Sequence, residues 1–255
     1  MNVRNAVSNG NAPTVISTFA GCGGSSLGYK LAGFRELLAV EWDNNAVETF
    51  RLNFPEVPVY HGDIAKLTGA ECMRLAGVGV GELDVFDGSP PCQGFSTAGK
   101  RKFDDPRNSL FREYARLLNE LQPRVFVMEN VTGMIKGHMK QAYLTIIKTL
   151  RDCGYKAKGE VLNAMYFNVP QSRERVIIIG VRNDLGIEPT HPKPQTKPTS
   201  VESICHEERG KKYVTFRNKG GGKHNSFSTS SRPLPTIMKG GGVQYYTTDK
   251  RHIMV

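Results

Sequence analysis

Short apolar runs alternate with longer amphipathic stretches between residues 14 and 182. Each apolar run is rich in Val, Ile, Leu or Phe and ends in a polar or small residue. This is the pattern of a strand buried on both faces of a parallel sheet. The runs predict strands at 14–19, 36–42, 57–62, 83–88 and 124–130. Two more strands, at 156–164 and 174–181, would complete the sheet.

Between these runs, apolar residues recur at helical spacing. Ser25, Asp43, Thr68 and Asn108 stand where helix N-caps are expected. Strands that alternate with helices predict an α/β fold with a doubly wound, Rossmann-like sheet, which binds ligands at the carboxyl ends of its strands. The predicted helices cover 25–33, 43–53, 68–77, 108–122 and 141–154.

The pattern changes after Arg182, where a proline-rich stretch leads into a basic tail. From His191 to Val255 there are twelve Lys and Arg residues against four Asp and Glu residues, so most of the net charge of +10 lies there. A polyanion such as nucleic acid would suit this tail, although a solvated basic surface has the same composition. We expect one domain at 14–182 and a small basic lobe at 183–255.

The composition narrows the class of protein. The chain of 255 residues has no run of eighteen apolar residues and a polar N-terminus. These features predict neither a membrane span nor a secretory signal, and we expect a cytoplasmic protein, nucleoid-associated if bacterial. The five cysteines include no C-x-x-C pair, so we expect free thiols and no bound metal.

A glycine-rich turn, FAGCGGSSLG, follows the first predicted strand and opens a helix. Glu41 ends the second strand, where a carboxylate can accept hydrogen bonds from ribose hydroxyls. The arrangement predicts a nucleoside cofactor, either a nicotinamide dinucleotide or S-adenosylmethionine. Trp42 could pack on adenine or belong to the core. Asp63 and Ile64 could meet the adenine edge, or Asp63 could simply form a turn.

Eight short motifs follow one another along the chain: FAGCGGSSLG, EWDNNAVETF, GDI, GSPPCQGFS, DPRNSLF, MENV, QSRERV and RPLPT. They occur in the order and approximate spacing typical of cytosine-5 DNA methyltransferases, which this chain resembles from Thr14 to Thr236. The resemblance implies the fold of S-adenosylmethionine-dependent methyltransferases, that cofactor, and methylation of cytosine C5 in duplex DNA, often within a restriction-modification system. It also implies a catalytic domain at 14–182 and a partial target-recognition region at 183–255.

The chemistry of cytosine methylation explains why a cysteine, Cys92, lies in the GSPPCQGFS motif. Cytosine C5 is a poor nucleophile, but a thiolate that adds to C6 turns C5 into an enamine carbon that can attack a sulfonium methyl group. The basic residues that follow Cys92 favour the thiolate, and the two preceding prolines restrict the backbone. The alternative is a passive loop cysteine.

Addition of sulfur at C6 moves electrons onto N3, which then needs an acid or a hydrogen-bond donor. Glu129 ends the fifth predicted strand, beside the strand that leads to Cys92, and the resemblance gives it this role. Arg173 and Arg175 alternate along the QSRERV motif. Their family counterparts contact the target base, the catalytic loop and phosphate; the alternative is a pair of exposed strand arginines.

The resemblance also implies two sets of contacts. A cytosine inside a duplex is unreachable, so the enzyme must flip it out and fill the gap with the loop after Cys92. The implied DNA contacts are Gln93, Ser96, Lys100, Arg101 and Arg232. The implied cofactor contacts are Phe19, Gly21, Cys22, Gly23, Gly24, Glu41, Trp42, Asp63, Ile64, Pro91 and Leu110.

Three alternatives stay open. Thymidylate synthase also uses a cysteine after two prolines, but it lacks the glycine loop with its Glu-Trp pair. A tRNA cytosine methyltransferase typically carries a Cys-Phe-Thr signature, which is absent here, and a non-catalytic DNA-binding subunit would not need Cys92 and Glu129. Family members normally end in a motif with a Gly-Asn pair that closes the cofactor pocket. Because this motif is absent, we expect a second subunit or a further C-terminal segment to complete the enzyme.

Overall fold

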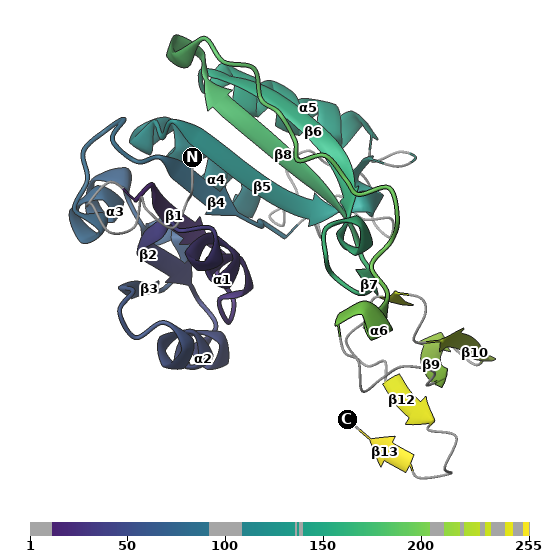
Figure 1. Ribbon diagram of the computed structural model, residues 1–255. Helices are drawn as coiled ribbons and strands as arrows, with labels where there is room; N and C mark the ends of the chain where they lie inside the picture. The colour runs from purple at the N-terminus through teal and green to yellow at the C-terminus, as the bar shows by residue number, and fades with distance from the viewer. Residues whose placement is uncertain are drawn as a thin grey trace. The chain divides into compact units, whose positions relative to one another are not determined.

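The computed structural model divides the chain into two compact units (Figure 1). The first comprises Met1–Glu160 and Val176–His191, and the second comprises Val161–Arg175 and Pro192–Val255. The functional labels given to 14–182 and 183–255 stay predictions. The structure describes residues 12–91, 109–135, 137, 140–204, 212–219, 222–229, 233–235, 243–246 and 252–254.

A seven-stranded sheet with the strand order β3-β2-β1-β4-β5-β8-β6 forms the centre of the fold. All seven strands predicted from the apolar runs are present, with bounds shifted by a few residues, and the predicted α/β class is confirmed. The strands are β1 (Thr14–Thr18), β2 (Arg35–Glu41), β3 (Val59–His61), β4 (Val85–Gly88), β5 (Val125–Val131), β6 (Tyr155–Asn163) and β8 (Glu174–Arg182).

The strand order reverses at β1, which lies between β2 and β4 and runs parallel to both. In the β1–β4 register, Ser17 lies opposite Asp87 and Thr18 opposite Gly88. Ligands of open parallel sheets bind in the crevice outside the carboxyl ends of the strands at such a reversal. The segments that follow Thr18 and Gly88 are therefore the place to look for a site.

One strand breaks the parallel pattern. β8 lies between β5 and β6, and only residues 164–173 connect it to β6. Parallel neighbouring strands need a crossover of about a dozen residues or more, and this connection is too short for one. β8 therefore runs antiparallel to β6, as the arrows in Figure 1 show.

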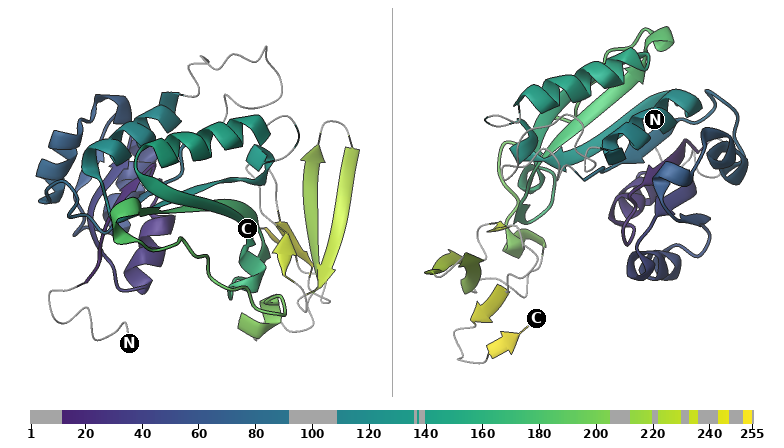
Figure 2. Two further views of the ribbon diagram at one scale, coloured as in Figure 1. Left: turned by 90° about the horizontal axis from the view of Figure 1, so that it is seen from above. Right: turned by 180° about the vertical axis from the view of Figure 1, so that it is seen from behind.

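Helices cover both faces of the sheet (Figures 1 and 2). On one face, α1 and α2 approach each other: the ring of Phe54, which caps α2, packs against Gly23 at the start of α1. On the other face, α4 contacts α3, and Cys153 at the end of α5 contacts the backbone of α4. The helices are α1 (Gly24–Leu31), α2 (Asn44–Asn53), α3 (Gly69–Ala76), α4 (Ser109–Leu121) and α5 (Lys140–Asp152).

The helix starts test the predicted N-caps. Asp43 accepts a hydrogen bond from the Ala46 N–H, and Thr68 accepts one from the Glu71 N–H, so both predictions are confirmed. The prediction of Ser25 is wrong, because the N-cap of α1 is Gly23, in a left-handed conformation that the sequence spacing does not reveal. Asn108 lies outside the described residues.

The second unit contains two small sheets. Four strands form one sheet in the order β10-β9-β12-β13, and β7 pairs in parallel with β11 in the other. This second pairing joins the QSRERV and RPLPT motifs. The strands are β7 (Gln171–Ser172), β9 (Lys212–Lys219), β10 (Gly222–Thr229), β11 (Leu234–Pro235), β12 (Val243–Tyr246) and β13 (His252–Met254).

Candidate cofactor and catalytic site

The loop after β1 requires backbone conformations that favour glycine. Gly21 and Gly23 have φ values of 56° and 96°, and Phe19 also has a φ of 56°. A Cβ atom on Gly23 would lie 2.2 Å from Cε2 of Phe54, so both packing and dihedral angle demand glycine there. Phe19 is a non-glycine residue in the left-handed region, and such strained residues cluster at functional sites.

Glu41, at the carboxyl end of β2, holds this loop through both oxygens of its carboxylate. Oε2 accepts a hydrogen bond from the Gly21 N–H at 2.8 Å. Oε1 accepts from the N–H groups of Trp42 at 2.8 Å and Asp43 at 3.0 Å. Glu41 is only 8% exposed, so these bonds replace water as its partners. The structure thus joins the predicted glycine loop to the predicted acidic strand end.

The rim of this loop leaves room for a ligand. A Cβ atom added to Gly21 or Gly24 would have no heavy atom within 4 Å, and Cys22 is exposed. Trp42 is 75% exposed, so the alternative of a core tryptophan is wrong. A nucleoside with its ribose near Glu41 and its base near Trp42 fits this set of residues.

The structure describes four further residues that were predicted to contact the cofactor. The carboxylate of Asp63 accepts a hydrogen bond from the Ala65 N–H and caps the short helix η3 (Ile64–Lys66). The side chain of Ile64 is buried in the larger core, against which half-buried Leu110 also packs, whereas Pro91 is exposed. Only the backbone of Ile64 could therefore meet an adenine edge. The cofactor role of all four residues stays a prediction.

The segment that leads from β4 towards position 92 is held by neighbours on both sides. The Thr18 hydroxyl donates to the backbone oxygen of Asp87 at 3.0 Å. From β5, Nδ2 of buried Asn130 donates to the backbone oxygen of Pro90 at 3.0 Å. A Cβ atom on Gly88 would lie 2.4 Å from the Thr18 hydroxyl oxygen and 2.6 Å from the Tyr114 ring. The position of this segment is thus fixed by β1 and β5.

Glu129 and Asn130 lie near the carboxyl end of β5, and Asn130 contacts this segment. Glu129 is half-buried near the carboxyl end of β5, as the sequence predicted, while its role stays a prediction. Asn130 was missed as a positioning residue. The signal was available in the MENV motif, because a buried amide next to a strand end must find hydrogen-bond partners.

A partly buried polar layer between α1 and the sheet was also missed. The hydroxyl of Tyr29 on α1 donates to Oδ1 of Asp87 at 3.1 Å, and the hydroxyl of Ser26 donates to Oε1 of Glu36 at 3.0 Å. Burial raises the pKa of Asp87 to about 7, and hydrogen bonds from Tyr29 and Ser25 only partly offset it. Burial also raises the pKa of Glu36.

Arg173 and Arg175 belong to the second unit. The backbone N–H of Arg173 donates to Oδ1 of Asn163, and Nη1 of Arg175 donates to the backbone oxygen of Glu174. Their contacts with a base or phosphate stay predictions. Six predicted residues lie outside the described part of the chain: Cys92, Gln93, Ser96, Lys100, Arg101 and Arg232.

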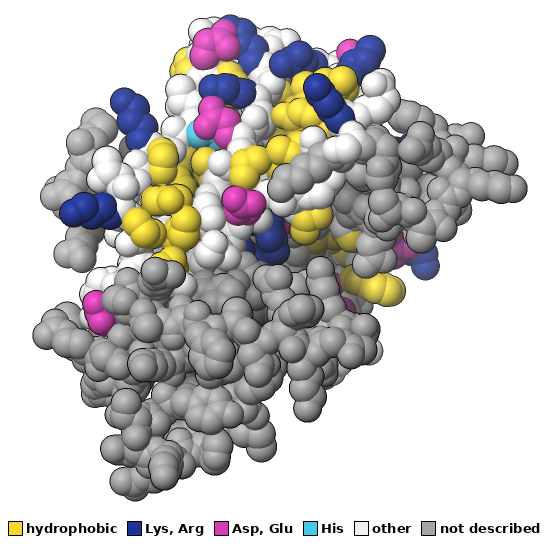
Figure 3. Space-filling view, turned by 90° about the vertical axis from the view of Figure 1, so that its right-hand side faces the viewer, with side chains coloured by type: hydrophobic (Ala, Val, Ile, Leu, Met, Phe, Trp, Pro, Cys, Tyr) yellow, Lys and Arg dark blue, Asp and Glu magenta, His cyan; other side chains and the backbone are white. Residues whose placement is uncertain are grey.

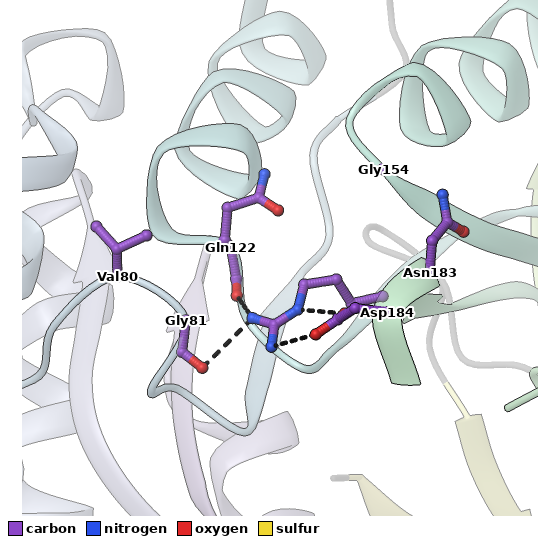
Figure 4. A pocket seen from close by; sticks show the side chains of 7 residues that line it. Val80, Gly81, Gln122, Gly154, Asn183 and Asp184 are labelled. Atoms are coloured by element: carbon purple, nitrogen blue, oxygen red, sulfur yellow. Dashed lines mark hydrogen bonds and ion pairs between the residues drawn. The ribbon is translucent and has the colours of Figure 1, made fainter. Parts of the chain in front are cut away.

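A cavity of about 520 Å³ lies at the opposite edge of the sheet, before β4 and β5 (Figure 4). Arg182 is one of the residues that line it. The guanidinium binds the Asp184 carboxylate and donates to the backbone oxygens of Gly81 and Gln122. With these partners, Arg182 is a structural tie between β8 and the neighbouring loops and offers little to an anionic ligand.

The remaining observations concern metals, thiols, membranes and surface charge. Within the described ranges, no cluster of His, Cys, Asp and Glu could hold a metal ion, and Cys22, Cys72 and Cys153 are free thiols. No helix in these ranges has both the length and the apolar character that a membrane span needs. On the face in Figure 3, the coloured basic and acidic side chains are interspersed.

Comparisons with known proteins agree with this geometry. The sequence profile of the family described as C-5 cytosine-specific DNA methylase matches residues 13–246. The chain is 39% identical over 194 residues to Type II methyltransferase M.XorII of Xanthomonas oryzae, covering 75% of this chain and 46% of that protein. It is 43% identical over 195 residues to Type II methyltransferase M.AquIA of Picosynechococcus, covering 73% of this chain and 78% of that protein.

Solved structures share the fold. One is described as a DNA modification methyltransferase encoded within an Escherichia coli prophage, with a TM-score of 0.64 and 28% identity, covering 83% of this chain and 62% of that chain. Another is a mutant of Spodoptera frugiperda DNMT2, with a TM-score of 0.59 and 27% identity, covering 76% and 59%. This chain spans about half the length of M.XorII and a larger share of M.AquIA.

Proposed function

Because the chain belongs to the C-5 cytosine-specific DNA methylases, we propose that it transfers a methyl group from S-adenosylmethionine to C5 of cytosine in duplex DNA. The observation that carries this proposal is the loop at the sheet reversal, where Glu41 binds Gly21 beside an exposed Trp42. The similarity to Type II methyltransferases supports modification of specific sites, and bacterial DNA would place the enzyme in the cytoplasm.

The cofactor would supply an electrophilic methyl group on a sulfonium. Glu41 and the loop around Gly21 would bind its ribose, and Trp42 would cover its adenine. Asp63 and the backbone of Ile64 would meet the edge of the base, while Phe19, Pro91 and Leu110 would line the remaining wall. These residues would orient the methyl group towards the segment after β4.

Cys92 would begin the chemistry as a thiolate that adds to C6 of the cytosine ring. In this addition the π-electron pair of the C5–C6 double bond would move onto C5 and N3, and Glu129 would stabilise the negative charge that develops at N3. C5 would then attack the methyl group, while the bond from that methyl group to the sulfonium sulfur breaks and leaves a neutral thioether. Loss of the C5 proton expels Cys92 and restores the aromatic ring. Asn130 and Thr18 would keep the backbone before Cys92 in place during these steps.

DNA would be bound largely through basic residues. Lys100, Arg101 and Arg232 would contact phosphate, with Gln93 and Ser96 beside the flipped base. Arg173 and Arg175 of the second unit would contact the base and the strand. The strong positive charge of the C-terminal region supports a polyanionic substrate.

The experiment is transfer of labelled methyl from S-adenosylmethionine to duplex DNA, with tRNA as the competing substrate. It is run with the 255-residue chain alone and with an added family segment that carries the Gly-Asn motif. We expect DNA to be labelled in preference to tRNA, at least when that segment is present. Labelling of tRNA alone, or of neither nucleic acid in either arm, would contradict the proposal.

A further inference from the structure

The contact between α1 and the sheet is polar, which is unusual for a helix that covers a sheet. The helix buries Ser26 and exposes Leu27 and Leu31. Beneath it lie the carboxyl groups of Glu36 on β2 and Asp87 on β4. A buried carboxyl group costs folding free energy unless it is hydrogen-bonded, so a carboxyl group retained here calls for an explanation.

Asp87 joins three elements of the candidate site. Its side chain accepts a hydrogen bond from Tyr29 on α1, the helix that starts in the cofactor loop. Its backbone oxygen accepts one from Thr18, the last residue of β1. Asp87 also precedes the segment Gly88–Pro91, which leads directly to Cys92. The rings of Tyr29 and Phe34 form a T-shaped pair with centroids 5.3 Å apart, and this packing restricts the orientation of the Tyr29 ring.

We propose that Tyr29 and Asp87 form a positioning pair that couples the cofactor loop to the segment before Cys92, so that the methyl donor and the nucleophile keep a fixed relative position. This inference rests on the proposed function and deepens it. Neither residue needs to touch substrate. Their hydrogen bond ties α1 to β4, the strand that pairs with β1 at the sheet reversal.

The charge environment makes the pair sensitive to pH near neutrality. Burial raises the pKa of Tyr29 far above its usual value, so its hydroxyl remains a donor. Ionised Asp87 would accept a stronger, charge-assisted bond than neutral Asp87. The titratable groups that face Asp87 are Tyr29 from α1, Glu36 from β2, Tyr114 from α4 and Glu129 from β5.

The test compares Tyr29→Phe and Asp87→Asn with the matched control Tyr155→Phe. Tyr155 also donates a buried hydroxyl bond, to the backbone oxygen of Pro123, but it lies at the start of β6. We measure single-turnover methyl transfer to duplex DNA and the affinity for S-adenosylmethionine. Tyr29→Phe should slow transfer about 10-fold at pH 8, since a hydrogen bond to a charged group is lost. Its cofactor affinity should change by less than about threefold, because no ligand contact is removed.

Asp87→Asn keeps the acceptor but cannot ionise. Its transfer rate should match the wild-type rate at pH 6 and fall about 5-fold below it at pH 8, where only the charge-assisted part of the bond is missing. Tyr155→Phe should transfer at the wild-type rate at both pH values. The positioning role would be contradicted if both Tyr29→Phe and Asp87→Asn transferred methyl groups at the wild-type rate at pH 8. It would also be contradicted if the Tyr155→Phe control lost as much of the transfer rate as these variants. Absence of transfer by the wild-type protein would instead count against the proposed function.

Discussion

At the scale of single residues, Glu41 has two roles that compete for the same atoms. An ionised carboxylate has about four acceptor sites, and backbone N–H groups of Gly21, Trp42 and Asp43 already use three of them. One site is left for a ribose hydroxyl. A second hydroxyl could bind only if one of the N–H groups gave way, so the loop should shift slightly when the cofactor binds.

This view of Glu41 predicts the effect of Glu41→Gln, which keeps the shape of the side chain and removes its charge. Binding of S-adenosylmethionine should weaken by about 1.5–3 kcal/mol, the range for a lost charge-assisted hydrogen bond. Titration calorimetry measures the change. The control is Glu48→Gln, an exposed carboxylate on α2. If both variants bound S-adenosylmethionine with equal affinity, Glu41 would not bind the ribose.

The proposed role of Glu129 depends on whether its side chain can carry a proton. Glu129→Gln retains a hydrogen-bond donor but cannot give a proton to N3. Single-turnover methyl transfer should slow by about 10²- to 10⁴-fold, the usual contribution of a general acid, while cofactor affinity is retained. An unchanged rate would remove Glu129 from the chemistry.

At the scale of elements, the end of β4 is closely packed against β1 and α4. Gly88→Ala would place a Cβ atom against Thr18 and Tyr114. We expect a loss of about 1–3 kcal/mol of unfolding free energy, as for an overpacked core. Gly28→Ala, with no heavy atom near the added Cβ in α1, should instead be neutral or stabilising by up to about 1 kcal/mol. Urea unfolding of both variants tests this. Equal unfolding free energies would show that the structure around Gly88 accommodates the added methyl group without cost.

The elements also show what could be predicted from the sequence. The strands β1 to β5 were found because buried parallel strands are near-continuous apolar runs, and Glu41 was found because it ends one of them. The start of α1 was misplaced because a positive φ at Gly23 leaves no side-chain signal. The contact of Asp87 with Tyr29 could not be predicted, since the two residues are 58 positions apart and meet only when α1 packs on the sheet.

At the scale of the whole molecule, Asp87 should make stability depend on pH. Its pKa is raised from 3.8 to about 7 in the folded state, so between these values the folded protein holds a proton that the unfolded chain has lost. Stability therefore falls as pH rises from about 4 to 7. Asp87→Asn removes this loss.

The unfolding free energy of Asp87→Asn, relative to the wild type, should therefore rise by about 2–3 kcal/mol between pH 5 and pH 8. Glu36 is present in both proteins, so its own titration cancels from the comparison to first order. Denaturant unfolding at the two pH values gives the four free energies required. Parallel changes in the two proteins would show that Asp87 is ionised throughout.

The central claim is that Cys92 forms a covalent bond with cytosine during methyl transfer. Duplex DNA containing 5-fluorocytosine tests it most directly, because fluorine cannot leave C5 as a proton does and the adduct is trapped. The protein, with its cofactor and the Gly-Asn segment if the transfer assay requires it, should give a denaturant-resistant complex with this DNA. Peptide mapping should place the link at Cys92, and Cys92→Ala should give no complex while still binding S-adenosylmethionine. A complex formed equally by Cys92→Ala, or none from a wild-type protein that methylates ordinary DNA, would contradict the mechanism.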